Sequence, residues 1–309
     1  MFAVPRKITT ITLLIASLLL PSLAQAVATD ACFNFLNAQD YARAESEAKQ
    51  LLQNSNLDRT EERYAQLCLG RAYFNIGRTT DALPALQRAE ALSQTTEELA
   101  TAYNWLGSMY SSLDDLDRAE LYHRRAFKAY RELGDKKKVA TALNNLALVA
   151  QNRGDTERAL QLYREALAMK PKAEQATTLN NIASIHDGRK EYKQAIKLLR
   201  QAIAIGRRNG DTHHSAQWQI NLGDILRKAK QYAAAEKELL AGLNAIRLVG
   251  DKNWEASACK ALGMLTVTKD NPKKSGVEAR QWFEKAEALY REIGDTDNAS
   301  KIANLLAGK

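Results

Sequence analysis

Apolar and small side chains recur along the chain with the period of a helix, and the pattern repeats as a block. Residues 143–167 read LNNLALVAQNRGDTERALQLYREAL, and residues 179–203 read LNNIASIHDGRKEYKQAIKLLRQAI. Within each block the apolar positions lie three and four residues apart, with one break at a Gly or a Lys, which predicts two helices joined by a tight turn. Such a helix pair cannot bury its apolar face alone, so successive pairs must stack.

A small residue stands in the middle of each predicted first helix, at intervals of 36 to 40 residues. These residues are Cys32, Gly70, Gly107, Ala147, Ala183, Gly223 and Gly263. An Ala follows each of them in the predicted second helix, twelve residues later, or sixteen in the last unit, which carries an insertion. Small side chains at fixed places in both helices let the two backbones approach closely. Gly-Asp dipeptides at residues 134, 210, 250 and 294 separate successive units, because Gly suits the end of a helix and Asp the N-cap of the next.

The pattern is most complete over residues 143–171, at Leu143, Leu146, Ala147, Gly154-Asp155, Ala159, Tyr163, Ala166 and Pro171. It resembles the tetratricopeptide repeat, and the long spacing with its Gly-Asp lead-in resembles the extended repeats of kinesin light chains. The resemblance implies an all-α, right-handed α-solenoid whose concave wall is lined by the first helices. We expect one domain over residues 27–309, with about seven helix pairs and a capping helix. The expected ranges are 27–55, 60–93, 97–134, 137–171, 173–210, 213–250 and 253–294, with the cap at 296–307.

The same resemblance places ligand-contacting positions around the central small residue of each first helix. In the middle repeats these positions are polar and almost uncharged: Thr101, Asn104, Ser108, Thr141, Asn144, Gln151, Thr177, Asn180 and Ser184. A carboxamide offers both a donor and an acceptor, so stacked Asn side chains can pair with the backbone of an extended peptide. The alternative is that these polar side chains only face solvent on the wall and contact no ligand. The second Asn of each pair, at 145, 181 and 221, is expected to bond neighbouring helices instead.

Toward the C-terminus the predicted wall becomes charged, with Asp224, Arg227, Lys228 and Lys260. These cations suit an acidic stretch of a partner protein. The whole chain has a formal net charge of +8. A basic chain can indicate nucleic acid, but the export predicted below argues against that partner.

The sequence contains none of the arrangements that support catalysis or metal binding. It has four His but no HExxH, no CxxC and no Gly-rich phosphate loop. The carboxylates are scattered over predicted solvent faces. We therefore expect a protein that is not an enzyme, with no metal and no cofactor.

The first 26 residues have the features of a secretory signal peptide. Arg6 and Lys7 precede an apolar run over residues 8–20, and Ala24-Gln25-Ala26 forms a small-residue cleavage site. The apolar run is short for a membrane span, although a retained N-terminal anchor is the alternative. The predicted location is therefore periplasmic or secreted. In that compartment Cys32 and Cys68 could form a disulfide, while Cys259 occupies a core position.

Two functions remain open from the sequence. The first is a scaffold or adaptor in the bacterial cell envelope that binds an extended segment of a partner protein in its groove. The second is a self-assembling structural component, favoured if Ile302, Leu305 and Leu306 of the last helix are exposed. The sequence leaves the oligomeric state open.

Overall fold

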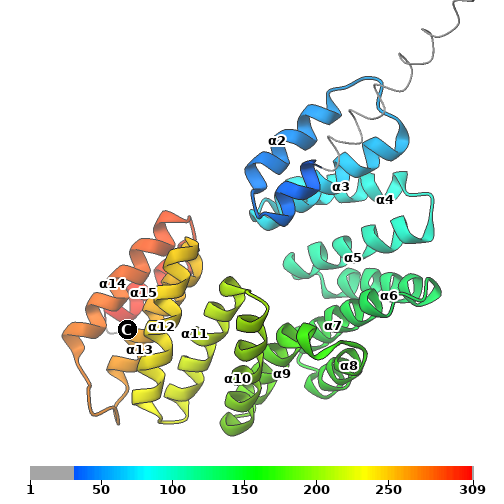
Figure 1. Cartoon of the computed structure of the whole chain (residues 1–309). Coiled ribbons are helices and arrows are strands. Elements are labelled where there is room, and N and C mark those ends of the chain that lie inside the picture. Colours follow the sequence, from blue (N-terminus) through cyan, green and yellow to red (C-terminus); the bar gives the residue numbers. More distant parts are fainter. Residues whose placement is uncertain (1–30, 308–309) are drawn as a thin grey trace, which may run out of the picture. The chain divides into compact units, whose positions relative to one another are not determined.

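The computed structural model describes residues 31–307, and all regular structure in that range is helical, which confirms the all-α prediction. The predicted signal peptide lies outside the described residues. Seven helix pairs and a final helix follow one another in this range (Figure 1). They are residues 31–37 with α2 (Tyr41–Leu52), α3 (Arg59–Asn75) with α4 (Thr79–Leu92), α5 (Thr96–Ser112) with α6 (Leu116–Glu132), α7 (Lys136–Asn152) with α8 (Thr156–Met169), α9 (Ala176–Gly188) with α10 (Tyr192–Arg208), α11 (Thr212–Lys228) with α12 (Tyr232–Val249), α13 (Lys252–Val267) with α14 (Gly276–Glu292), and α15 (Thr296–Leu306).

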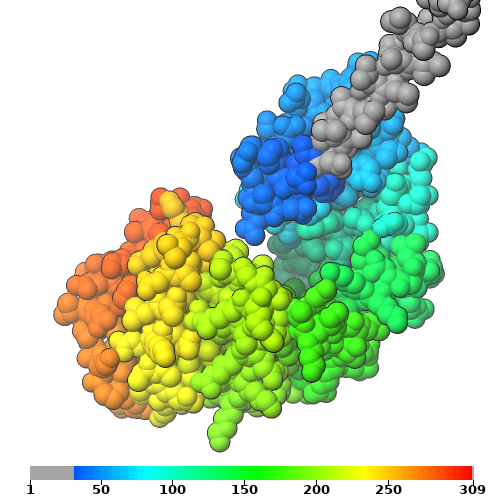
Figure 2. All heavy atoms as spheres, in the orientation of Figure 1, coloured from blue at the N-terminus to red at the C-terminus, as the bar shows by residue number. Residues whose placement is uncertain are grey.

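The chain forms two compact units, one up to Val149 and one from Ala150 onward, which we call the N-terminal and C-terminal units. Within each unit the helices pack in chain order. Thus α4 contacts both α3 and α5, and α12 contacts both α11 and α13. Figure 2 shows the same order in the C-terminal unit as successive colour bands from green to red. The boundary falls inside α7, so the single domain expected for residues 27–309 stays a prediction.

The glycine in the middle of four of the first helices faces a large side chain of the paired second helix. A Cβ added to Gly70 would lie 2.7 Å from Leu86 Cγ, and one added to Gly107 would lie 2.6 Å from the His123 ring. The space beside Gly223 is filled in the same way by Leu239, and the space beside Gly263 is filled by Phe283. Because these gaps are already occupied, even a methyl group would overpack the pair and cost about 1–3 kcal/mol. This close approach is the physical reason for the periodic small residue.

The predicted Gly-Asp boundaries adopt the expected geometry. Gly134 and Gly250 have φ values of 71° and 82°, in the left-handed region that glycine tolerates best. The Asp that follows each glycine accepts a hydrogen bond from a backbone amide three residues on, as Asp251 does from Trp254 N at 3.0 Å. Each dipeptide therefore ends one helix and caps the next.

The ends of the repeat array differ from its middle. Cys32 and Cys68, both fully buried, form a disulfide that joins residues 31–37 to α3, with Cα atoms 6.4 Å apart. Cys259 on α13 is a buried free thiol, and burial raises its pKa to about 11. In α15, Ile302 is buried while Leu305 is 41% exposed. The apolar surface that would favour self-assembly is thus smaller than expected, because Ile302 packs into the fold.

Candidate functional site

The paired asparagines bond to one another across neighbouring first helices. In the N-terminal unit, Asn145 Nδ2 on α7 donates to Asn104 Oδ1 on α5 at 3.0 Å. In the C-terminal unit, Asn221 Nδ2 on α11 donates to Asn180 Oδ1 on α9 at 3.2 Å. Asn180 Nδ2 in turn donates to the neighbouring Asn181 Oδ1 at 3.3 Å. Asn104 and Asn180 therefore help to hold the first helices together, a role predicted only for the second Asn of each pair. Ligand contact by Asn104, Asn144 and Asn180 stays a prediction.

The predicted hydroxyl positions are partly engaged within their own helices. Thr101, Thr141 and Ser108 each donate to a backbone carbonyl four residues earlier, at 2.9, 3.1 and 3.1 Å. Further along, Gln151 Nε2 donates to Ser184 Oγ at 3.4 Å. Thr177 is exposed on α9. A hydroxyl whose proton is used in this way can still accept a hydrogen bond from a ligand N–H group.

The charged positions of the C-terminal unit form a closed network. Arg227 Nη2 lies 2.8 Å from Asp224 Oδ1, and Lys228 Nζ lies 2.9 Å from Asp224 Oδ2. Lys228 also pairs with Asp187 of α9 at 2.7 Å. Burial by itself raises the pKa of Asp224, but Arg227 and Lys228 lower it below its ordinary value. Two carboxylates thus neutralise two cations within the fold, and contact of Arg227 and Lys228 with an acidic stretch of a partner stays a prediction.

A cavity of about 600 Å³ lies on the first-helix wall of the C-terminal unit. It is lined from α11 by Ile220, Asn221, Asp224 and Arg227, from α13 by Trp254, Ser257, Lys260, Ala261 and Met264, and from α15 by Lys301 and Leu305. Within the described part of the chain, Lys260 and Lys301 have no ion pair with a carboxylate. The structure therefore brings three predicted residues, Asp224, Arg227 and Lys260, to one cavity, and adds Lys301, which the sequence analysis missed.

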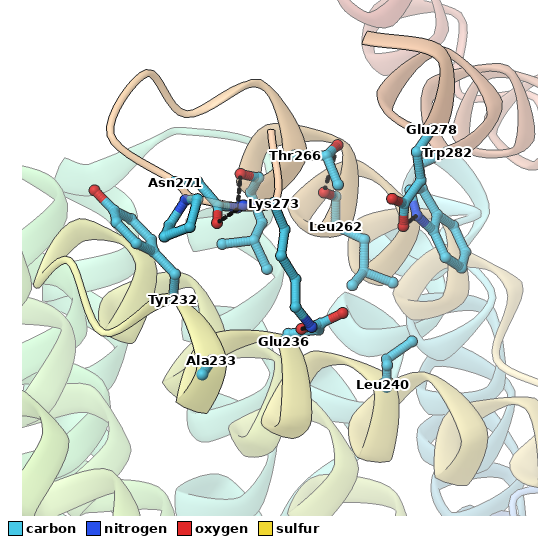
Figure 3. Close-up of a pocket in the computed structure, with 12 residues that line it drawn as sticks. Tyr232, Ala233, Glu236, Leu240, Leu262, Thr266, Asn271, Lys273, Glu278 and Trp282 are labelled. Atoms are coloured by element: carbon cyan, nitrogen blue, oxygen red, sulfur yellow. Dashed lines mark hydrogen bonds and ion pairs between the residues drawn. The ribbon is translucent and has the colours of Figure 1, made fainter. Parts of the chain in front are cut away.

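A second cavity, of about 250 Å³, is formed by the insertion in the seventh repeat (Figure 3). Leu240 and Tyr232 of α12 line one side, and Trp282 of α14 lines the other. Lys273 crosses the opening in Figure 3 and its Nζ lies 2.7 Å from Glu236 Oε2. The sequence marked this insertion only as an irregularity, because nothing local indicates that its loop closes over a pocket.

The sequence analysis also missed an aromatic cluster on the first helices of the N-terminal unit. Arg71 of α3 lies between Phe33 of residues 31–37 and Trp105 of α5, and Phe74 packs edge-on against Trp105 at 5.9 Å between ring centroids. Phe33 and Arg71 each stand one residue after the central small residue. Ser108, a predicted ligand-contacting residue, stands at the same place after Gly107, so this position in the first two repeats indicates Phe33 and Arg71.

No group of three or more His, Cys, Asp or Glu side chains among residues 31–307 is placed to hold a metal ion. No helix in the same range is long and apolar enough to cross a membrane.

Comparison with known families decides the identity of the fold. Models described as tetratricopeptide repeat match residues 34–96, 98–172 and 174–247. The chain belongs to the tetratricopeptide repeat family. The TPR assignment confirms the resemblance to the tetratricopeptide repeat, while the likeness to the extended repeats of kinesin light chains stays a prediction. It makes the chain a member of a family of protein-interaction modules that are generally non-catalytic. A comparison with curated proteins finds no match.

Solved structures with the same TPR fold share little sequence with the chain. A Rap protein complexed with Competence and Sporulation Factor is 14% identical over 93% of this chain and 98% of its own, with a TM-score of 0.66. The apo quorum sensor NprR from B. thuringiensis is 15% identical over 92% and 86%, with a TM-score of 0.65. The Rap conjugation gene regulator of plasmid pLS20, in complex with the Phr* peptide, is 17% identical over 96% and 82%, with a TM-score of 0.65. At these identities the likeness concerns the fold alone.

Proposed function

We propose that this TPR protein is a non-catalytic adaptor that binds an extended segment of a partner protein on its first-helix wall. The observation that carries the proposal is the cavity of about 600 Å³ on α11, α13 and α15. Its lining combines apolar side chains such as Trp254 and Met264 with the cations Lys260 and Lys301, which form no ion pair with a carboxylate of residues 31–307. This mixture suits a peptide segment with an apolar anchor and an acidic group. A related fold in complex with the Phr* peptide supports a peptide as the kind of ligand.

A cavity-filling variant tests this proposal. Ala261 lies in the lining of the cavity, so Ala261→Trp should fill it, whereas Ala241→Trp places the same ring on an exposed position of α12. We expect wild type and A241W to capture the same partner from an envelope extract, and A261W to lose at least about tenfold in affinity, the weight of a single well-buried contact.

Circular dichroism of both variants controls for folding. Equal capture of the partner by A261W and A241W, with both folded, would show that the cavity does not bind it.

We further propose that the protein acts in the bacterial cell envelope, in the periplasm or outside it. The N-terminal sequence supports export, with Arg6 and Lys7 before an apolar run and a small-residue site ending at Ala26. The disulfide between Cys32 and Cys68 also supports an oxidising compartment. N-terminal sequencing of the protein recovered from a periplasmic fraction should begin at Val27. A chain recovered from the cytosol with Met1 in place would exclude export.

A further inference from the structure

Arg71 holds a positive charge in an apolar setting on the first-helix wall of the N-terminal unit. Its guanidinium Cζ lies 4.7 Å from the ring centroid of Trp105 and 5.2 Å from that of Phe33. The two rings belong to the first helices on either side of α3, as the order of elements in Figure 1 shows. A cation between aromatic faces is attracted to both of them, but the rings supply no formal negative charge.

One hydrogen-bond donor of this guanidinium is unmet. Within residues 31–307, the Nε of Arg71 is buried without a hydrogen-bond partner and no carboxylate forms an ion pair with the side chain. Burial lowers the pKa of Arg71, which is the mark of a desolvated charge. The residue as a whole remains partly exposed.

Arg63, on the same helix, is a second arginine with a buried Nε that lacks a hydrogen-bond partner, and it differs from Arg71 in one contact. Its Cζ lies 4.2 Å from the ring centroid of Tyr64, much as Arg71 lies beside Trp105. Arg63, however, also forms an ion pair with Glu98 of α5, with 3.2 Å between Nη2 and Oε1. A buried cation is stable when a carboxylate compensates its lost hydration. Arg71 has the aromatic contacts of Arg63 without the carboxylate.

We propose that Arg71, flanked by Phe33 and Trp105, binds a carboxylate of a peptide next to an apolar side chain of that peptide. The planar guanidinium matches a carboxylate, which it can bind through two parallel hydrogen bonds. A single cation balances the single charge of a carboxylate, whereas a phosphate carries nearly two charges. The surrounding rings of Phe33, Phe74 and Trp105 provide contact area for the neighbouring apolar side chain.

This inference goes beyond the proposed function because it concerns different residues in the other unit. Its test does not depend on the cavity on α11, α13 and α15. A peptide bound at Arg71 would still bind to A261W.

The test uses the full-length protein and four fluorescein-labelled pools of hexapeptides with degenerate flanking positions. The first pool has a free C-terminal carboxylate after a Leu, and the second is the same pool amidated. The third is amidated and has a central Glu between two Leu, and the fourth has Gln in place of that Glu. Fluorescence polarisation measures the affinity of wild type, Arg71→Gln and Arg125→Gln for each pool. Arg125 is the matched control, because it is an exposed cation that also lies near aromatic rings, those of Tyr103 and Tyr122.

We expect wild type and R125Q to bind a carboxylate pool about 10- to 100-fold more tightly than its amide partner, the effect of one charged hydrogen-bonded contact. R71Q should lose this preference and melt at the same or a higher temperature than wild type, because an uncompensated charge has been removed. Preferential binding of the first pool identifies a C-terminal carboxylate as the ligand, and preferential binding of the third identifies a side-chain carboxylate.

Three results would overturn the assignment. One is that wild type binds no carboxylate pool more tightly than its amide partner, and another is that R71Q keeps the preference. The third is that inorganic phosphate binds through Arg71 while neither carboxylate pool does.

Discussion

Replacement of Cys32 and Cys68 by alanine is expected to lower the free energy of unfolding of the N-terminal unit by about 3–4 kcal/mol. The disulfide closes a loop with a sequence separation of 36 residues and ties residues 31–37 to α3. A helical segment as short as 31–37 is not stable alone. Terminal repeats also have a neighbour on one side only, so loss of the bond should unfold the first pair before the rest.

Hydrogen exchange locates the effect and thereby provides its control. In C32A/C68A the amides of residues 31–37 and α2 should lose protection, while those of α9 to α14 keep it. Cys259→Ala removes a thiol from α13 and should leave protection of residues 31–37 unchanged. If the double variant protects its first helix pair as wild type does, the disulfide does not stabilise that end of the array.

Acidification from pH 7 to pH 4 is expected to lower the free energy of unfolding of the N-terminal unit by about 3 kcal/mol. A single side chain, His123, accounts for this change. This imidazole is 1% exposed on α6, packs into the space left by Gly107, and burial lowers its pKa from 6.5 to about 4. Between these two pH values the unfolded chain binds a proton that the folded chain does not. Stability is therefore complete above pH 6.5 and decreases progressively as the pH falls to 4.

His123→Leu isolates this contribution. Leu86, Leu199 and Leu239 stand at the corresponding place in other repeats and are buried there, so leucine fits the site. Urea unfolding between pH 7 and pH 4 should give a much shallower dependence on pH for H123L than for wild type. If the free energy of unfolding of H123L depends on pH as steeply as that of wild type, groups other than His123 cause the acid sensitivity.

The fold could be predicted because its determinants are local and repeated. The small residue facing a large side chain and the Gly-Asp boundary are both visible within one unit of the sequence, as at Gly70 and at Gly250-Asp251. Because the pattern repeats, a helix pair predicted correctly in one repeat is also predicted correctly in the others. The TPR family assignment rests on this same regularity.

The site was harder to predict because it depends on contacts between repeats. The sequence shows Lys228 and Asp187 but not that they meet across 41 residues to form an ion pair. The bond from Asn145 to Asn104, over the same separation, likewise changes the role of Asn104. Arg71 was missed as well, but its place in the repeat register can be read from the sequence, and only its lack of a carboxylate partner requires the structure.

The disulfide joins the first two of the chain's three cysteines in sequence order. A chain that leaves a membrane channel N-terminus first would meet oxidant with Cys32 and Cys68 exposed while Cys259 has yet to emerge, so the two can pair without competition. When α13 later folds, Cys259 is buried with its pKa raised to about 11, and the thiolate needed to attack the existing bond becomes scarce. In a chain exported as proposed, this order of emergence and the burial of the third thiol would protect against disulfide scrambling.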